Sequence, residues 1–381
     1  MRINRDEEYG VYVHIPFCLQ KCAYCDFISY PGLLSRADSY LEQVAKEAEY
    51  YRGCRADTVY IGGGTPTCLS IEQMSKLLKQ LTESFCLTAD CEITVECNPK
   101  TADGAYFKRL RAAGANRLSI GVQSFCDREL ALLGRLHNAE EAQQCVKLAQ
   151  DSGFENINLD LMFGLPNQTV EQAMENTERA IALKPTHISA YSLILEEGTP
   201  LAERVRQGEL TLPDEETERG MYHEMVHRLA QDGYERYEIS NFARNGFVSK
   251  HNNKYWERRP YIGLGAAAHS QIGKLRYANP DGLEEYAALS IKPPPEGRET
   301  EVLSRNDEIA EFVFLGLRKM CGIRKSEFRS LFFQEIESVY GAQLDKFCSL
   351  GLLEQSGDVI RLTPSGIDVS NSVFCEFLLE E

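Results

Sequence analysis

The chain has 381 residues, of which 43% are hydrophobic, and a formal net charge of −16. Nucleic-acid binding is driven largely by Lys and Arg, so this charge argues against a nucleic-acid partner and against broad attraction to anionic lipid, although peripheral membrane contact through another protein stays open. No apolar run reaches the roughly 18 residues that span a bilayer, and 13 scattered cysteines predict a reducing, cytoplasmic location.

From residue 9 to about residue 195, short β-branched runs alternate with amphipathic stretches. We expect strands over residues 10–15, 58–61, 92–96, 117–122, 156–161 and 187–193. Helix starts lie between them, with a capping residue followed three positions later by Gln or Glu: Ser70 and Gln73, Asn138 and Glu141, Thr169 and Gln172. This α/β repeat predicts a parallel sheet. Six units fall short of a complete eight-unit barrel, so we expect an open, partial (βα)6 barrel.

Three cysteines follow the first predicted strand at a C-x3-C-x2-C spacing, namely Cys18, Cys22 and Cys25. Three close thiolates suit a loop folded around an iron–sulfur or zinc centre. A cubic four-iron cluster closed by protein takes four cysteines, so this motif would leave one iron open to a small ligand. The alternative is a zinc site with His14 as the fourth ligand. A disulfide is disfavoured, because three neighbouring thiols cannot pair among themselves.

Glycine-rich and polar segments lie where the next strands end. Gly62-Gly63-Gly64-Thr65-Pro66 follows the second strand, Glu96-Cys97-Asn98-Pro99 ends the third, Gln123-Ser124-Phe125 follows the fourth, and Asp160 lies in the fifth. Each alone has a simpler explanation, such as a tight turn or a helix cap. The carboxyl ends of parallel strands converge, however, and the first strand brings the cysteines to the same edge. We therefore expect one cavity lined by both groups.

Five segments carry a family resemblance: residues 12–18, 62–66, 96–99, 121–125 and 160–166. They resemble oxygen-independent coproporphyrinogen III oxidase and its relatives, and the C-x3-C-x2-C spacing after the first strand resembles the signature of the radical S-adenosylmethionine (SAM) superfamily to which these proteins belong. The resemblance implies that Cys18, Cys22 and Cys25 hold a 4Fe-4S cluster whose open iron takes the amino and carboxylate groups of SAM. It also implies SAM contacts by Tyr12, Gly64, Thr65, Glu96, Gln123, Arg135 and Asp160. Arg135 could equally be an exposed helix-entry residue.

A second motif, His251-Asn252-Asn253-Lys254-Tyr255-Trp256, lies beyond the predicted barrel. An imidazole can bind haem iron, and flat rings can lie against the macrocycle. A structural, hydrogen-bonded histidine among core aromatics is the alternative. The pattern is similar to the motif of the haem chaperone branch of the same family, which implies that His251 binds haem.

Two features separate the sequence from the oxidase. Cys25 is followed by Asp26 and Phe27, where the oxidase motif continues to a further cysteine, and only 17 residues precede Cys18. We therefore expect a haem chaperone that passes haem to acceptor proteins, by resemblance respiratory enzymes. The alternatives are an oxygen-independent coproporphyrinogen III dehydrogenase of porphyrin biosynthesis and a zinc-stabilised interaction protein. Whether the chain is an enzyme stays open at this point.

Beyond residue 200 we expect a helix over residues 214–232, closed by Gly233, and an extended segment over 237–242. Pro293-Pro294-Pro295 predicts a linker between a core of residues 1–290 and a second domain of residues 291–381. In the second domain we expect helices over 306–320, from Lys325 and over 342–350, a hairpin over 352–362 and a last helix from Pro364. This small α+β pattern resembles a winged helix. In so acidic a chain it predicts a lid or protein contact surface.

Overall fold

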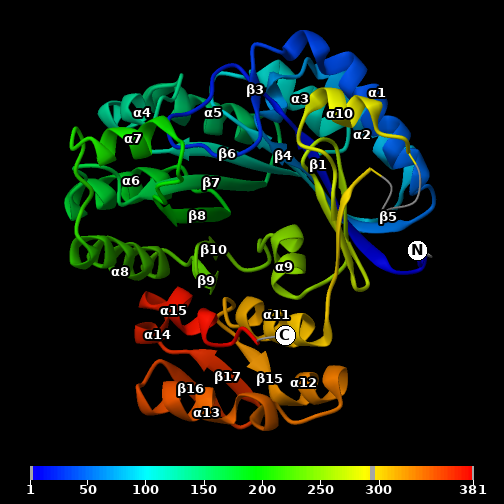
Figure 1. The fold of residues 1–381 in the computed structure, drawn as a ribbon. Helices are drawn as coiled ribbons and strands as arrows, with labels where there is room; N and C mark the ends of the chain where they lie inside the picture. Colours follow the sequence, from blue (N-terminus) through cyan, green and yellow to red (C-terminus); the bar gives the residue numbers. More distant parts are fainter. Residues whose placement is uncertain (1–2, 292–296, 380–381) are drawn as a thin grey trace.

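The computed structural model describes residues 3–291 and 297–379 (Figure 1). Within them the largest sheet has 12 strands in the order β14-β13-β12-β11-β1-β4-β5-β6-β7-β8-β10-β9. Its centre consists of β1 (Glu8–Ile15), β4 (Arg55–Gly63), β5 (Cys86–Cys97), β6 (Arg117–Gln123), β7 (Asn156–Phe163) and β8 (His187–Ser192). Neighbours in this run are parallel throughout. The predicted partial (βα)6 barrel is confirmed.

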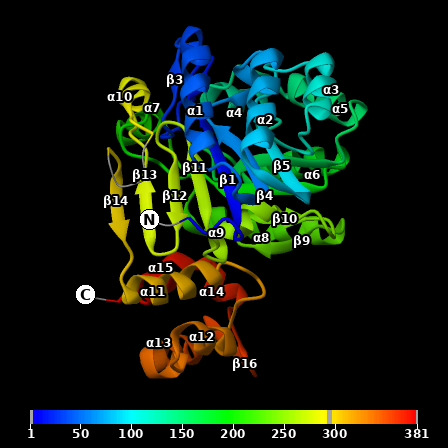
Figure 2. The same ribbon diagram turned by 90° about the vertical axis from the view of Figure 1, so that its right-hand side faces the viewer.

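Helices cover the outer face of these strands (Figures 1 and 2). They are α1 (Ala37–Tyr50), α2 (Ile71–Ser84), α3 (Gly104–Ala112), α4 (Asp127–Leu132), α5 (Ala139–Asp151), α6 (Val170–Ala182), α7 (Pro200–Arg206) and α8 (Glu215–Gln231). All three predicted capping boxes are present, at the starts of α2, α5 and α6. No helix in the described residues is long and apolar enough to cross a bilayer.

Side chains alternate along the parallel strands, as the two-residue period of a strand requires. Val59, Ile61, Val95, Ile120 and Leu159 belong to the buried apolar core under the helices. The intervening positions turn inward and are polar: Thr58, Tyr60, Thr94, Glu96, Arg117, Ser119, Asn158, Asp160 and His187. The register places Glu96 beside Ser119 and Gly121 beside Asp160. The interior of the barrel is therefore lined by polar side chains.

The sheet continues past both edges of the barrel. On one side β11 (Tyr261–Leu264) is parallel to β1, and β12 (His269–Ile272), β13 (Leu275–Ala278) and β14 (Glu299–Val302) follow as antiparallel strands. On the other side lie β10 (Asn241–Ala243) and β9 (Glu235–Glu238), where an extended segment was expected. The sequence did not predict β11 to β14. Each has only four residues, and all four residues of β14 are exposed, so no apolar pattern marks it.

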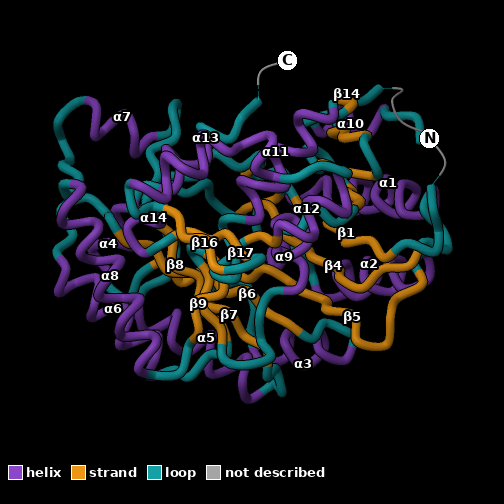
Figure 3. The backbone as a smooth tube through the Cα atoms, turned by 90° about the horizontal axis from the view of Figure 1, so that it is seen from below, coloured by secondary structure: helices purple, strands orange, loops and turns teal. Residues whose placement is uncertain are grey.

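The C-terminal elements lie below the barrel in Figure 1 and in front of it in Figure 3. They are α11 (Arg305–Gly316), β15 (Ile323–Arg324), α12 (Lys325–Phe332), α13 (Ile336–Ser349), β16 (Leu353–Ser356), β17 (Val359–Leu362), α14 (Pro364–Asp368) and α15 (Ser370–Cys375). Helices and a small sheet share a core of their own, as expected. Helix α13 starts earlier than predicted because it continues through a kink at Tyr340.

The predicted linker at residues 293–295 lies outside the described residues. The division of the chain at residue 290 stays a prediction. Strand β14 follows that point and still pairs with β13, so the large sheet extends to Val302.

A buried carboxylate joins α1 to the segment beyond β11. Glu47 is fully buried and accepts hydrogen bonds from Gly265 N at 3.0 Å, Asn279 Nδ2 at 2.9 Å, Tyr286 Oη at 2.7 Å and Arg298 Nη2 at 2.9 Å. Arg298, its ionic partner, is 2% exposed at the side chain. Removing one member of such a pair leaves the other charge buried and uncompensated.

We expect Glu47→Ala to lower the free energy of unfolding by about 3–5 kcal/mol, measured by urea denaturation. Glu49→Ala is the matched control in the same helix, because Glu49 pairs with Arg52 at the surface, and it should leave the midpoint almost unchanged. Equal midpoints for the two variants would show that Glu47 does not hold this junction.

Candidate functional site

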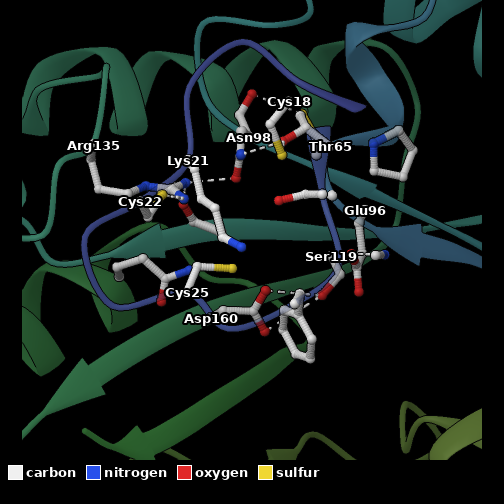
Figure 4. A pocket seen from close by; sticks show the side chains of 18 of the residues that line it. Cys18, Lys21, Cys22, Cys25, Thr65, Glu96, Asn98, Ser119, Arg135 and Asp160 are labelled. Carbon is white, nitrogen blue, oxygen red and sulfur yellow. Dashed lines mark hydrogen bonds between the residues drawn. The ribbon is translucent and has the colours of Figure 1, made fainter. Parts of the chain in front are cut away.

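A cavity of about 360 Å³ lies at the carboxyl ends of the parallel strands. Figure 4 shows the cysteines around this cavity, each beside a residue from another part of the rim: Cys18 beside Thr65, Cys22 beside Arg135 and Cys25 beside Asp160. The structure brings together nine of the eleven predicted residues as cavity lining: Cys18, Cys22, Cys25, Gly64, Thr65, Glu96, Gln123, Arg135 and Asp160. The convergence expected from the sequence is thus present, and Tyr12 and His251 are the two that lie elsewhere.

The cysteine loop is anchored to the barrel rim by backbone contacts. Ala23 N donates to Leu133 O at 2.9 Å, and Leu201 N donates to Ala23 O at 2.8 Å. Burial raises the pKa of the Cys18 thiol and raises that of Cys25 to about 11. Both are therefore protonated at neutral pH unless a positive centre stabilises the thiolate. A bound metal does so.

Two glycines permit the close approach of backbone to the cysteine loop and the cavity floor. A Cβ on Gly64 would lie 2.8 Å from Phe17 O and 3.1 Å from Cys18 Sγ. A Cβ on Gly121 would lie 2.9 Å from Asn98 Oδ1. Any larger residue would fill the space at these points, so both positions favour glycine.

Arg135 enters the cavity and is not an exposed helix-entry residue. Its Nη2 donates to Asn98 Oδ1 and to Gly121 O, both at 2.6 Å, and its Nη1 lies 3.4 Å from Cys22 Sγ. Its Nε is buried and has no hydrogen-bond partner among the described residues. A buried donor of this kind calls for an acceptor, which a bound ligand can supply.

Two carboxylates lie on the cavity floor. Glu96 accepts from Tyr60 Oη at 2.8 Å and from Gly63 N at 3.1 Å. Burial raises the pKa of Glu96 to about 7, and the Tyr60 hydrogen bond opposes this shift. Asp160 accepts from Asn158 Nδ2 at 2.7 Å and from Ser119 Oγ at 3.2 Å, and burial raises its pKa as well. Such carboxylates suit the ammonium or hydroxyl groups of a ligand.

Gln123 lies in the left-handed region with φ of 66°, at an irregularity in the pairing of β6 with β7. This conformation is uncommon for a residue other than glycine, and such conformations concentrate at functional sites. The bulge places the Gln123 side chain in the cavity lining.

Tyr12 lies behind the cavity. Its hydroxyl is 3.0 Å from His14 Nδ1, and its ring stacks at 6.3 Å on that of Tyr60. His14 Nε2 is 2.8 Å from Ile28 O, so both ring nitrogens of His14 are engaged. His14 is therefore not free to act as a fourth zinc ligand, and the zinc interpretation loses the residue on which it depended.

His251 lies in α9 (Lys250–Trp256), at the opposite end of the barrel. It is 1% exposed, with Nδ1 2.8 Å from Thr58 Oγ1 and Nε2 2.9 Å from Tyr255 Oη. Neither ring nitrogen is free for haem iron in this structure. The predicted haem role of His251 stays a prediction, and it requires the loss of one of these hydrogen bonds.

Sequence reasoning missed several cavity residues, among them Lys21, Tyr60, Asn98, Ser119 and Tyr191. Strand alternation could have found two of them. Tyr60 lies two positions before Gly62, and Ser119 two before Gly121, so each faces inward with the predicted strand-end residue. Asn98 was part of a quoted motif but received no role. Figure 4 shows Lys21 reaching from the cysteine loop into the cavity.

Two segments of the chain match known protein families, in agreement with this geometry. Residues 12–180 match the radical SAM superfamily, and residues 303–369 match the HemN C-terminal domain. Fold and site together define a radical SAM protein.

The heme chaperone HemW of Lactococcus lactis is 38% identical over 372 residues, which cover 98% of each chain. HemW of Escherichia coli is 36% identical over 382 residues, covering 97% of this chain and 98% of the relative. The chain belongs to the HemW family.

Among solved structures, coproporphyrinogen III oxidase (HemN) from Escherichia coli superposes with a TM-score of 0.84 at 26% identity. The match covers 98% of this chain and 90% of HemN. The resemblance to that oxidase and its relatives, drawn from five short segments, is confirmed over nearly the whole chain.

We expect SAM affinity to rise as the pH rises through about 7, the pKa of Glu96. Below this value the carboxyl is neutral and accepts hydrogen bonds from the N–H groups of the SAM amino group only weakly, so affinity should fall by up to about tenfold per pH unit. Equilibrium dialysis of the reconstituted protein measures it. Glu96→Gln should bind weakly with a flat profile across this range, and an unchanged pH dependence in that variant would assign the titration elsewhere.

Proposed function

We propose that this protein is a haem chaperone built on a radical SAM scaffold, which binds haem and transfers it to acceptor haem proteins. The observation that supports it most is the near-full-length similarity to proteins named heme chaperone HemW. Respiratory enzymes are the proposed acceptors. We place the protein in the cytoplasm, with peripheral membrane contact open, because all 13 cysteines are free thiols.

The cavity suits a 4Fe-4S cluster held by Cys18, Cys22 and Cys25, with one iron left open. SAM would fill the rest of it, with Gly64 and Thr65 offering backbone groups, Glu96 receiving the amino group, and Gln123, Arg135 and Asp160 completing the contacts. Tyr12 would act from behind the cavity, where its ring stacks on that of Tyr60. The cluster supplies one electron to the sulfonium of bound SAM in this superfamily.

The orphaned Nε of Arg135 and the two buried carboxylates support this assignment. Each of these groups is buried yet borders the cavity, and each is matched by a hydrogen-bonding group on SAM: a carboxylate, an amino group or ribose hydroxyls. The donor set therefore fits the cofactor on chemistry as well as on position.

A second candidate is an oxygen-independent coproporphyrinogen III dehydrogenase, favoured by the structural match to HemN. Against it stands Phe27, which occupies the position of the further oxidase cysteine. Phe27 lines the cavity and its side chain is 63% exposed. An apolar ring at this point cannot supply the thiol of that cysteine.

We expect the anaerobically reconstituted full-length protein, loaded with one equivalent of haem, to transfer it to an apo-cytochrome b, measured as recovery of the acceptor's absorption spectrum. The same sample, given coproporphyrinogen III and SAM, should form no protoporphyrinogen, because the site lacks the further cysteine. Free haem at equal concentration and haem-loaded serum albumin are the controls for passive transfer.

Two results would overturn the proposal. The first is acceptor loading no faster than from haem-loaded albumin. The second is SAM-dependent porphyrinogen turnover proportional to protein, which would make the dehydrogenase the function. Phe27→Cys tests the proposed reason directly, since turnover that is absent in the parent and gained in the variant would place the difference at this residue.

A further inference from the structure

Helix α9 closes the amino end of the parallel strands, opposite the cofactor cavity (Figure 1). Glu92 in β5 accepts the backbone N–H groups of Lys250 and His251, each at 3.2 Å. Lys254 Nζ lies 2.7 Å from Asp57 Oδ1, and the Lys254 side chain is 8% exposed. These contacts fix the helix against the starts of β4 and β5.

The imidazole of His251 reaches from this helix into the barrel. It lies between two hydroxyl groups, of Thr58 and Tyr255, and stacks on the ring of Tyr60 with centroids 5.2 Å apart and planes 29° apart. Burial lowers the pKa of His251 to about 3, so the ring is neutral at every physiological pH. It is a flat, uncharged surface beneath Tyr60.

Tyr60 in turn reaches the cavity. Its ring is held between His251 and Tyr12, at 5.2 Å and 6.3 Å, and its hydroxyl donates to Glu96 Oε1 at 2.8 Å. Among the described residues, Glu96 has only one other hydrogen-bond donor, the amide of Gly63. A displacement of the Tyr60 ring would therefore remove one of two hydrogen bonds that aim the carboxylate.

We infer that His251 is a positioning residue for the cofactor cavity, because its ring holds Tyr60 where the hydroxyl reaches Glu96. The identity of the ligand at Glu96 rests on the proposed function; the column of His251, Tyr60 and Glu96 does not. His251 then positions a cavity residue from the opposite end of the barrel.

This role and iron ligation use different parts of the imidazole, the ring face for stacking on Tyr60 and a ring nitrogen for iron. An axial bond to haem iron would take the nitrogen that now contacts Thr58 or Tyr255. A side chain that fills the column as a flat ring without nitrogen, as in His251→Phe, therefore separates the two roles.

The first measurement is titration of the Glu96 carboxyl by infrared difference spectroscopy on cluster-free protein, with Glu96→Gln to identify the band. The groups that face Glu96 are Tyr60, Asp160, Arg117, Tyr12 and Tyr255. The Tyr60 hydrogen bond lowers the Glu96 pKa, so Tyr60→Phe and His251→Ala should both raise it. His251→Phe should stay near the parent, and His251→Leu, which fills the volume without a flat ring, should follow His251→Ala.

The second measurement is SAM affinity of the reconstituted full-length protein. Tyr60→Phe and His251→Ala should each weaken binding by roughly tenfold, and the double variant should be no weaker than the worse single one, because both act through one contact. Trp256→Phe is the matched control in the same helix, since Trp256 packs against Arg318 at 4.6 Å and away from the barrel interior. It should bind SAM like the parent.

The outcomes separate cleanly. Parent-like Glu96 titration and SAM affinity in both His251→Ala and His251→Leu would overturn the inference. Weaker haem binding, with a shifted Soret band of the haem that still binds, in His251→Phe, while its Glu96 titration stays normal, would give His251 the iron as well. The His251 variants could shift the Glu96 titration while Glu96→Gln leaves SAM affinity unchanged. In that case His251 still positions Tyr60, and the assignment of SAM to Glu96 is overturned instead. Where His251→Ala does not fold, His251→Leu and Tyr60→Phe decide.

Discussion

The hydrogen bonds of the barrel interior are the constraint on which the rest of this structure depends. A buried polar atom without a partner costs about 1–3 kcal/mol, and every second residue of the central strands turns such atoms inward. Most of them satisfy one another across neighbouring strands, as Asn158, Asp160 and Ser119 do. In the described residues, Arg135 Nε at the cavity has no partner, and neither do Arg117 Nε and Thr94 Oγ1, which lie beside each other nearer the amino ends of β6 and β5.

The same alternation places the residues that stabilise the fold and the residues that form the site on opposite faces of the strands. Apolar positions lie under the helices and form the core, while polar positions one residue away form the site, so the strands that hold the fold together also aim the cavity groups. Two buried carboxylates, Glu96 and Asp160, share this interior with the buried guanidinium of Arg117. Burial raises both of their pKa values, and Arg117 opposes the shift. A cationic ligand group would stabilise the ionised form of these two buried carboxylates.

The barrel also connects two distant parts of the chain. The cavity lies at the carboxyl ends of the strands, and α9 lies at the amino ends, where Arg258 Nε contacts Glu311 Oε2 of α11 at 3.1 Å. The C-terminal elements thus brace the helix that carries His251. Through Tyr60, that helix reaches Glu96.

Much of this could be predicted from sequence. The six central strands, the three capping boxes and the meeting of cysteines with strand-end residues follow from local periodicity and from parallel-strand geometry. Strands β11 to β14 could not, because each has only four residues, too few to show a two-residue period, and each forms by pairing with the strand before it, starting from β11 on β1. The surroundings of His251 were also beyond reach, since its partners Thr58 and Tyr60 are almost 200 positions away in the chain.

The central claim is that three cysteines leave one iron of a 4Fe-4S cluster open to SAM in this cavity. Electron–nuclear double resonance on the reduced, reconstituted protein tests it most directly, with SAM labelled with nitrogen-15 at the amino group. The account predicts a hyperfine coupling to nitrogen-15 that disappears when unlabelled SAM replaces the labelled form. A reduced cluster with a full iron and sulfide content, saturated with labelled SAM and showing no such coupling, would contradict it.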